Sequence, residues 1–146
     1  MKKNIARDIF DAISELSHNL RSQHHQASRE QGSNVAGMGF KALAFIASHE
    51  GATQKDLVER SGRDKGQIAR IVTELKNQQL VEAIADSKDR RISRLRATAQ
   101  GQALAQQFES RHTELAERAV SSLDQQQCEQ LLALLKQLNI NLDQSE

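Results

Sequence analysis

Three observations predict a mainly α-helical fold with one small β-hairpin. The 146 residues include no proline and are rich in Ala, Leu, Gln, Lys, Arg and Glu, all of which favour helices. Apolar residues recur at steps of three and four over most of the chain, and this period changes only between residues 80 and 96. The length and the 38% hydrophobic content suit a chain that buries a core without disulfides or metal.

Two helices are predicted in the N-terminal third. The first covers residues 4–29, where the apolar side chains form a single stripe: Ile5, Ile9, Ile13, Leu16 and Leu20. Residues 31–34 are expected to form a loop. Residues 36–49 are apolar on nearly every side, which predicts a buried helix. Gly51 lies just past its end, where a glycine can close a helix in the left-handed conformation.

The next segment predicts two short helices joined by a tight turn. Thr53 and Asp64 are expected as N-caps of helices at 53–60 and 65–78, each followed three residues later by a side chain that can complete a capping box. Ser61–Gly62 form the turn between them. Two short helices with a glycine-containing turn of this length are typical of a helix-turn-helix.

A β-hairpin with a charged tip is predicted directly after the second of these helices. Residues 80–84 favour a strand, residues 86–89 a turn, and residues 92–96 a return strand. Such a hairpin in this place is a wing, so the sequence predicts a winged helix-turn-helix.

Two further helices are expected after the wing. Thr98 is the predicted N-cap of a helix that ends near Ser121, and Asp124 is the predicted N-cap of the last helix. The last helix carries apolar residues in steps of 3, 4, 3 and 4: Cys128, Leu131, Leu135, Leu138 and Leu142. This spacing suits a helical seam between two molecules, and an intramolecular core face fits it equally well.

Positive charge is concentrated in the middle of the chain. Residues 52–98 contain 11 Lys/Arg and 7 Asp/Glu, whereas residues 99–146 contain 3 and 7. A basic segment of this kind between neutral and acidic helices indicates nucleic-acid binding.

The outer face of the helix at 65–78 suits the major groove of duplex DNA. A helical wheel places Ile68, Ile71, Val72 and Leu75 on the inner face. The opposite face and its edges combine cations, short side chains, amides and a hydroxyl, which can reach base edges: Lys65, Gly66, Gln67, Arg70, Thr73 and Asn77. A solvated surface without a ligand is the alternative.

The wing tip is the sharper feature, because a thin hairpin that ends in arginines can enter the minor groove. The tip comprises Lys88, Asp89, Arg90 and Arg91. Asp89 is expected to hold a neighbouring guanidinium by paired hydrogen bonds. Arg94 and Arg96 are expected to project from one face of the return strand, available to phosphates.

These residues resemble the signature of the MarR family: D-x-R, five residues, then L-T-x-x-G. Asp89 and Arg91 match its first part, and Thr98 and Gly101 match its second part, with Ala97 in place of leucine. The segment TQKDLVERSGRDKGQIARIVTELKNQQLVE is similar to the helix-turn-helix of the family. Together with the long helices on either side, the resemblance covers nearly the whole chain.

The resemblance implies a single domain over 1–146 with a winged DNA-binding lobe at 36–98 and a helical dimerisation lobe at 4–30 and 99–144. The helix at 65–78 would be the recognition helix, and the wing at 85–91 would enter the minor groove. Arg91 would be the minor-groove residue, oriented by Asp89. The resemblance also implies that the chain is a repressor that forms a homodimer and binds a pseudo-palindromic operator in double-stranded DNA. A small-molecule effector would release it from the DNA.

Two further sets of residues follow from the resemblance. The dimerisation residues would be Ile5, Ile9, Ile13, Leu131, Leu135, Leu138 and Leu142. Family analogy places four residues near an effector pocket: His24, His25, Phe40 and Phe45. The chain departs from the family at Gln79, where glycine is common, and at Ala83 and Ile84, where basic residues are common.

The alternatives are a redox- or metal-responsive regulator of the same fold and a helical protein-binding module without DNA activity. Cys128 is the only cysteine, and on an apolar seam it reads more naturally as a small core residue than as a sensor. The histidines lack the spacing of a metal site, so neither a metal nor a cofactor is expected. The sequence contains neither a nucleophile motif nor a phosphate-binding glycine loop, so an enzyme is not expected. Without a signal peptide or a spanning segment, a cytoplasmic location is expected.

Overall fold

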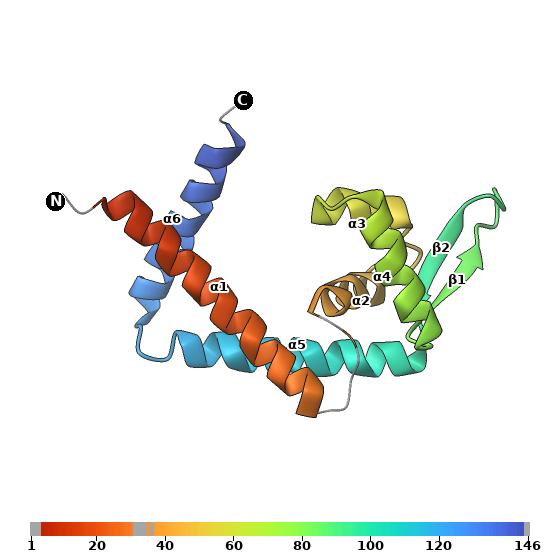
Figure 1. The fold of residues 1–146 in the computed structure, drawn as a ribbon, viewed down its shortest axis with the longest axis horizontal. Coiled ribbons are helices and arrows are strands. Elements are labelled where there is room, and N and C mark those ends of the chain that lie inside the picture. Colours follow the sequence, from red (N-terminus) through yellow and green to blue (C-terminus); the bar gives the residue numbers. More distant parts are fainter. Residues whose placement is uncertain (1–3, 31–34, 36, 145–146) are drawn as a thin grey trace. The chain divides into compact units, whose positions relative to one another are not determined.

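The computed structural model describes residues 4–30, 35 and 37–144, and it confirms a mainly helical fold with a two-stranded antiparallel wing (Figure 1). The predicted loop at 31–34 lies outside the described residues. The elements follow in the predicted order: α1 (Ile5–Glu30), α2 (Gly37–Ser48), α3 (Gln54–Ser61), α4 (Lys65–Asn77), β1 (Val81–Ala85), β2 (Ser93–Ala97), α5 (Ala99–Ala119) and α6 (Gln125–Asp143). The chain divides into two compact units, Met1–His112 and Thr113–Glu146, and the boundary falls within α5.

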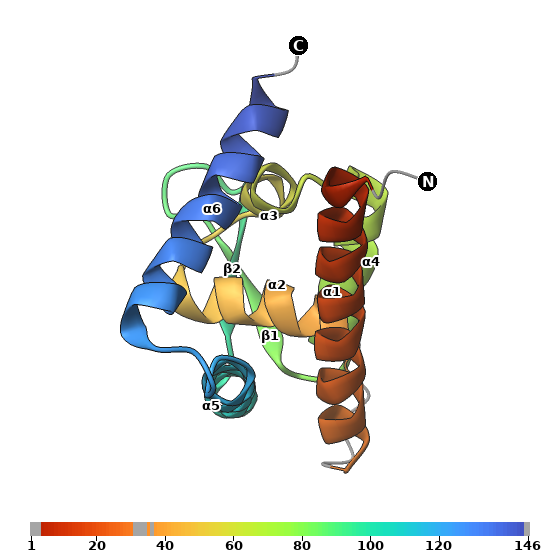
Figure 2. The same ribbon diagram turned by 90° about the vertical axis from the view of Figure 1, so that its left-hand side faces the viewer.

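The core of the first unit lies where α2 packs against α4 and β2. Its fully buried side chains are Leu43, Ile46, Val72, Leu75 and Leu95. They come from three elements that are distant in the sequence, so this core holds the helix-turn-helix and the wing to one scaffold. In agreement with its apolar sequence, α2 runs through the middle of this lobe (Figure 2).

The caps that define the helix-turn-helix form as local hydrogen bonds. The Thr53 hydroxyl accepts from the N–H of Asp56 at 3.2 Å, and the Asp56 carboxylate accepts from the N–H of Thr53 at 2.9 Å, which completes the capping box of α3. At α4 the Asp64 carboxylate accepts from the N–H of Gln67 at 2.9 Å. The structure records no reciprocal bond from the Gln67 side chain, so that capping box is only half formed.

Gly51 has the predicted left-handed conformation, with φ of 87°, but its role differs from the one predicted. Its N–H donates to the carbonyl of Leu95 in β2 at 3.1 Å and so does not cap α2. The N–H of Leu95 in turn donates to the carbonyl of Ala52 at 2.8 Å. The turn after α2 therefore pairs with the wing through an isolated antiparallel bridge between Ala52 and Leu95.

The connection from α4 to β1 shows why glycine is common in the family at the position of Gln79. The N–H of Leu80 donates to the carbonyl of Leu75, and the N–H of Gln79 donates to that of Lys76, both at 3.0 Å. This is the Schellman arrangement, which places Gln79 in the left-handed region with φ of 60°. A glycine adopts that conformation without the steric cost of about 1–2 kcal/mol that a side chain brings.

The start of α5 packs on the backbone just before the wing. The N–H of Thr98 donates to the carbonyl of Leu80 at 3.0 Å, and the Thr98 hydroxyl accepts from the N–H of Gly101 at 3.0 Å. A Cβ atom at Gly101 would overlap the carbonyl oxygen of Leu80. The T-x-x-G part of the signature therefore records a close approach between a helix and the wing.

The second unit contains α6, whose N-cap is the predicted Asp124. A full capping box forms there, since Asp124 and Gln127 exchange hydrogen bonds at 2.9 and 3.0 Å. Within α6, which the structure describes throughout, no side chain is buried. Of the predicted seam, Leu131 and Leu142 are exposed, while Cys128, Leu135 and Leu138 are half-buried.

In the part of the chain that the structure describes, every helix is too short or too polar to cross a bilayer.

Candidate nucleic-acid interface

The outer face of α4 is exposed, as the helical wheel predicts. Ile68, Val72 and Leu75 are buried, whereas the predicted contact residues are exposed: Lys65, Gly66, Gln67, Arg70, Thr73 and Asn77. The Arg70 side chain is 83% exposed and lies 3.4 Å from the carboxylate of Glu74 one turn away. Such an exposed pair is weak, so the guanidinium can exchange this partner for a base or phosphate.

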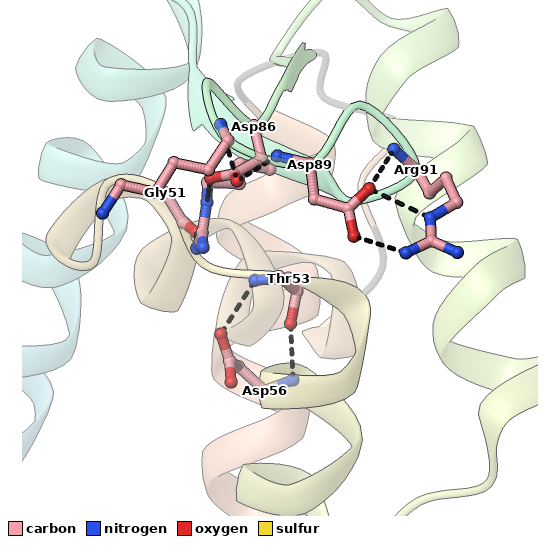
Figure 3. A network of polar contacts seen from close by, with 8 residues as sticks. Gly51, Thr53, Asp56, Asp86, Asp89 and Arg91 are labelled. Atoms are coloured by element: carbon pink, nitrogen blue, oxygen red, sulfur yellow. Dashed lines mark hydrogen bonds and ion pairs between the residues drawn. The ribbon is translucent and has the colours of Figure 1, made fainter.

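Arg91 extends from the wing tip as a preorganised guanidinium. Its Nε and Nη2 donate to the two carboxylate oxygens of Asp89 at 3.1 and 3.0 Å, and its backbone N–H also donates to Asp89 at 3.0 Å (Figure 3). The paired hydrogen bonds predicted from the sequence are thus present. The side chain of Arg91 remains 91% exposed, so Nη1 is open to solvent.

The same contacts keep both partners charged. The hydrogen bonds from Arg91 lower the pKa of the Asp89 carboxyl below its ordinary value, chiefly through the guanidinium and then through the backbone N–H. The bond to Asp89 raises the pKa of Arg91. The pair is therefore ionised throughout the neutral range, and Asp89 acts as an acceptor that fixes the direction of the arginine.

Arg94 and Arg96, which were predicted to be available to phosphates, are about half exposed and also pair with groups of the protein itself. Arg94 donates from Nε to Asp86 at 2.7 Å and from Nη1 to the carbonyl of Gly51 at 2.8 Å. Arg96 donates from Nε and Nη2 to one carboxylate oxygen of Glu82. Both guanidinium groups are held by partners that the hairpin register and the α2–α3 turn bring within reach. The remaining tip residues, Lys88 and Arg90, are exposed as predicted.

Asp86 is a site residue that the sequence analysis did not single out. One carboxylate oxygen accepts from Arg94, and the other accepts from the N–H groups of Lys88 and Asp89 at 3.1 and 3.0 Å (Figure 3). These bonds hold the pKa of Asp86 below its ordinary value, with the bond from Arg94 as the largest cause. An aspartate at the first position of a turn was the available signal, because its side chain can accept from the N–H groups that follow.

The structure brings together only part of the proposed effector pocket. His24 and Phe40 both pack on Phe108, with ring centroids 4.8 and 4.9 Å apart. His25 is exposed. Phe45 stacks instead on His49 at 4.3 Å, beside a shallow hollow of about 540 Å³ at the end of α2. The side chains of His25 and Phe45 are therefore not grouped with His24 and Phe40.

His24 also meets His112, with Nε2 and Nδ1 3.1 Å apart in a shared hydrogen bond. Burial lowers the pKa of His24, and its electrostatic interactions with His112, Arg111 and Lys41 lower it further. Across residues 4–30, 35 and 37–144, no three His, Cys, Asp or Glu side chains come together as metal ligands would.

The polar outer face of α4 and the arginine-tipped hairpin beside it define a winged helix-turn-helix of the kind found in transcription regulators. Residues 35–92 match the sequence model of the MarR family. The chain is therefore similar to the MarR family over α2, α3, α4 and β1.

One relative and two solved structures are also similar to the chain. The chain is 29% identical to the HTH-type transcriptional regulator BilQ of Clostridium symbiosum over 96 residues, which are 66% of this chain and 67% of BilQ. Its fold resembles FabT of Streptococcus pneumoniae in complex with DNA, with a TM-score of 0.83, 14% identity and coverage of 97% and 99% of the two chains. The complex of S. aureus MepR with DNA gives a TM-score of 0.81 at 21% identity, with coverage of 89% and 95%.

Proposed function

We propose that the chain is a sequence-specific transcription regulator that binds double-stranded DNA as a homodimer, with α4 in the major groove and the wing at 85–91 in the minor groove. The observation that carries the proposal is the exposed Arg91 guanidinium, held by Asp89 at the tip of a hairpin beside the polar face of α4. FabT and MepR, which share the fold, are both crystallised with DNA.

In this proposal α4 and the wing contact different grooves of the duplex. The face of α4 offers one guanidinium, amides and a hydroxyl, which can pair with base edges in the major groove. The thin wing carries a fixed cation toward the minor groove, where the negative potential is strongest when the groove is narrow. Gly66 lets the N-terminus of α4 approach the backbone closely, since no side chain intervenes.

Two-fold symmetry is part of the proposal. The winged lobe at 36–98 would bind DNA, and the segments at 4–30 and 99–144 would join two copies. Apolar side chains are exposed on both segments, among them Ile5, Ile9 and Phe10 on α1 and Leu131 and Leu142 on α6. Exposed apolar surface of this kind favours association. The operator would be pseudo-palindromic, with half-sites about one helical turn apart.

Regulation by a small molecule, repression and a cytoplasmic location complete the proposal. An effector would bind near His24 and Phe40, whose rings meet at Phe108. No cofactor is included.

The test is selection of bound fragments from a random duplex library by the purified protein, followed by titration of the selected sequences at several salt concentrations. A two-fold symmetric motif whose affinity falls steeply with salt supports the proposal, because phosphate contacts release counterions. Recovery of fragments without a shared motif would reduce the protein to a non-specific binder, and recovery of none would remove DNA as its ligand.

Replacing Arg70 by alanine is expected to relax base preference at one position of each half-site. A guanidinium that pairs with a guanine contributes about 1–3 kcal/mol of discrimination, so the preference for that base should fall about 5- to 150-fold. Competition binding against operators substituted at each position measures the effect. Lys136→Ala, a loss of the same charge on α6, is the matched control. Equal losses on all sequences would make Arg70 a phosphate contact.

Replacing Leu135 and Leu138 by lysine is expected to give monomers. Both side chains lie on the predicted seam of α6 and are half-buried, so a charge there would be trapped in an apolar interface. Sedimentation velocity measures the change. The control is Ala133→Lys with Gln137→Lys, which adds the same charge to the opposite side of α6. A Leu135→Lys/Leu138→Lys protein that remains dimeric would place the seam within one chain.

A further inference from the structure

We propose that Asp86, Arg94 and the carbonyl of Gly51 form a wing clamp that positions Arg91 for the minor groove. This inference rests on the proposed function and assigns a role to Asp86. Arg94 becomes a positioning residue here, where the sequence had indicated a DNA contact.

The wing clamp joins the two arms of the hairpin to a turn that lies 43 residues before Arg94. The guanidinium of Arg94 in β2 bridges the Asp86 carboxylate at 2.7 Å and the Gly51 carbonyl at 2.8 Å. Asp86 ends the first arm of the hairpin, and Gly51 belongs to the turn between α2 and α3. The side chain of Asp86 is only 15% exposed, so this ion pair is better shielded from solvent than the others of the hairpin. The wing is thereby tied to the scaffold that carries α4.

The contacts continue from the wing clamp to Arg91 without a gap. The second carboxylate oxygen of Asp86 accepts from the N–H groups of Lys88 and Asp89, which fixes the backbone of the tip (Figure 3). The Asp89 carboxylate then holds both the backbone and the guanidinium of Arg91. Each residue of the series is oriented by the one before it. The direction of Arg91 therefore depends on Asp86.

The sign of one substitution separates positioning from simple electrostatics. Asp86 is an anion on the part of the hairpin that would approach phosphates, so removing its charge should tighten DNA binding if only the overall field mattered. If Asp86 positions the tip, the same change should weaken binding. Asparagine keeps one acceptor oxygen, which cannot serve both Arg94 and the two backbone N–H groups in the observed way.

The experiment compares Asp86→Asn with Glu82→Gln in operator binding. Glu82 supplies the matched control, because it loses the same charge on the same hairpin and pairs with Arg96 outside the wing clamp. We expect Asp86→Asn to weaken binding about 3- to 10-fold, the cost of ordering one flexible side chain on association. Glu82→Gln should leave affinity unchanged or raise it. Tighter binding by both variants would overturn the proposal.

Coupling to Arg91 provides the second readout. If Asp86 acts through Arg91, then Asp86→Asn should have no effect on affinity in a protein that already carries Arg91→Ala. A merely structural role would lower affinity by the same factor in both backgrounds, and that result would contradict the wing clamp. Arg94→Lys should behave like Asp86→Asn, because a single ammonium does not reproduce the two divergent donors of the guanidinium.

A third readout uses the free protein and keeps this proposal separate from the proposed function. Amide hydrogen exchange by NMR should be faster at Lys88, Asp89 and Arg91 in Asp86→Asn and unchanged there in Glu82→Gln. Unchanged exchange in Asp86→Asn would overturn the wing clamp whether or not DNA binds. Faster exchange in a protein whose parent binds no duplex would instead refute the DNA-binding function and, with it, the purpose assigned to the wing clamp.

Discussion

Replacing Arg91 by alanine is expected to weaken operator binding about 100-fold or more, with no change in thermal unfolding. The loss is large because a dimer would lose two charge-assisted contacts at once, one at each wing. The fold should persist, since the side chain is 91% exposed and its bonds go only to Asp89. Fluorescence anisotropy with a labelled operator measures the affinity, and calorimetry checks the unfolding temperature.

Two variants separate the shape of the guanidinium from its charge. Arg91→Lys keeps the cation and loses the paired bonds to Asp89, so it should recover only part of the affinity. Arg90→Ala removes a neighbouring exposed cation and should cost less than Arg91→Ala, because Arg91 is the arginine held by Asp89. Wild-type affinity in Arg91→Ala would exclude the wing from the interface.

Replacing Gly101 by alanine is expected to destabilise the protein by about 3 kcal/mol or more, among the largest effects that a single substitution produces. The added methyl group would overlap the carbonyl oxygen of Leu80 and lie 2.9 Å from its carbonyl carbon. That carbonyl cannot move away freely, because it also accepts the N–H of Thr98. The helix start and the wing would have to separate.

Urea unfolding measures this change through the shift of the midpoint. Gly66→Ala is the matched control, since Gly66 lies near the start of α4 and its added Cβ would meet only Asp64 Oδ1, at 3.2 Å. That substitution should be neutral or stabilise by up to about 1 kcal/mol through helix propensity. A loss below about 1 kcal/mol in Gly101→Ala would mean that the close approach to Leu80 is relieved cheaply.

Features that depend on a few neighbouring residues could be predicted from the sequence. The capping boxes at Thr53 and Asp124 and the paired bonds between Asp89 and Arg91 all join residues two or three positions apart. The exposed face of α4 follows from helical periodicity for the same reason. The family signature added the expectation that these elements bind DNA.

Contacts between distant segments could not be predicted in this way. Arg94 was expected to face phosphates, yet the fold places it between Asp86 and Gly51, which lies 43 residues away. Phe45 was grouped with Phe40, yet the two rings point to different neighbours, His49 and Phe108. Periodicity specifies which face of an element is apolar, but it does not specify which segment packs against that face.

The sequence by itself determined the helices, their N-caps, the wing and the arginine at its tip, because each arises from interactions between residues that are close in the sequence. Only the tertiary structure decided that the turn at Gly51 pairs with β2, that Asp86 and Arg94 tie the wing to it, and that Gly101 must lack a side chain beside Leu80. Those outcomes depend on how separate elements pack around the shared core, which local propensity does not encode.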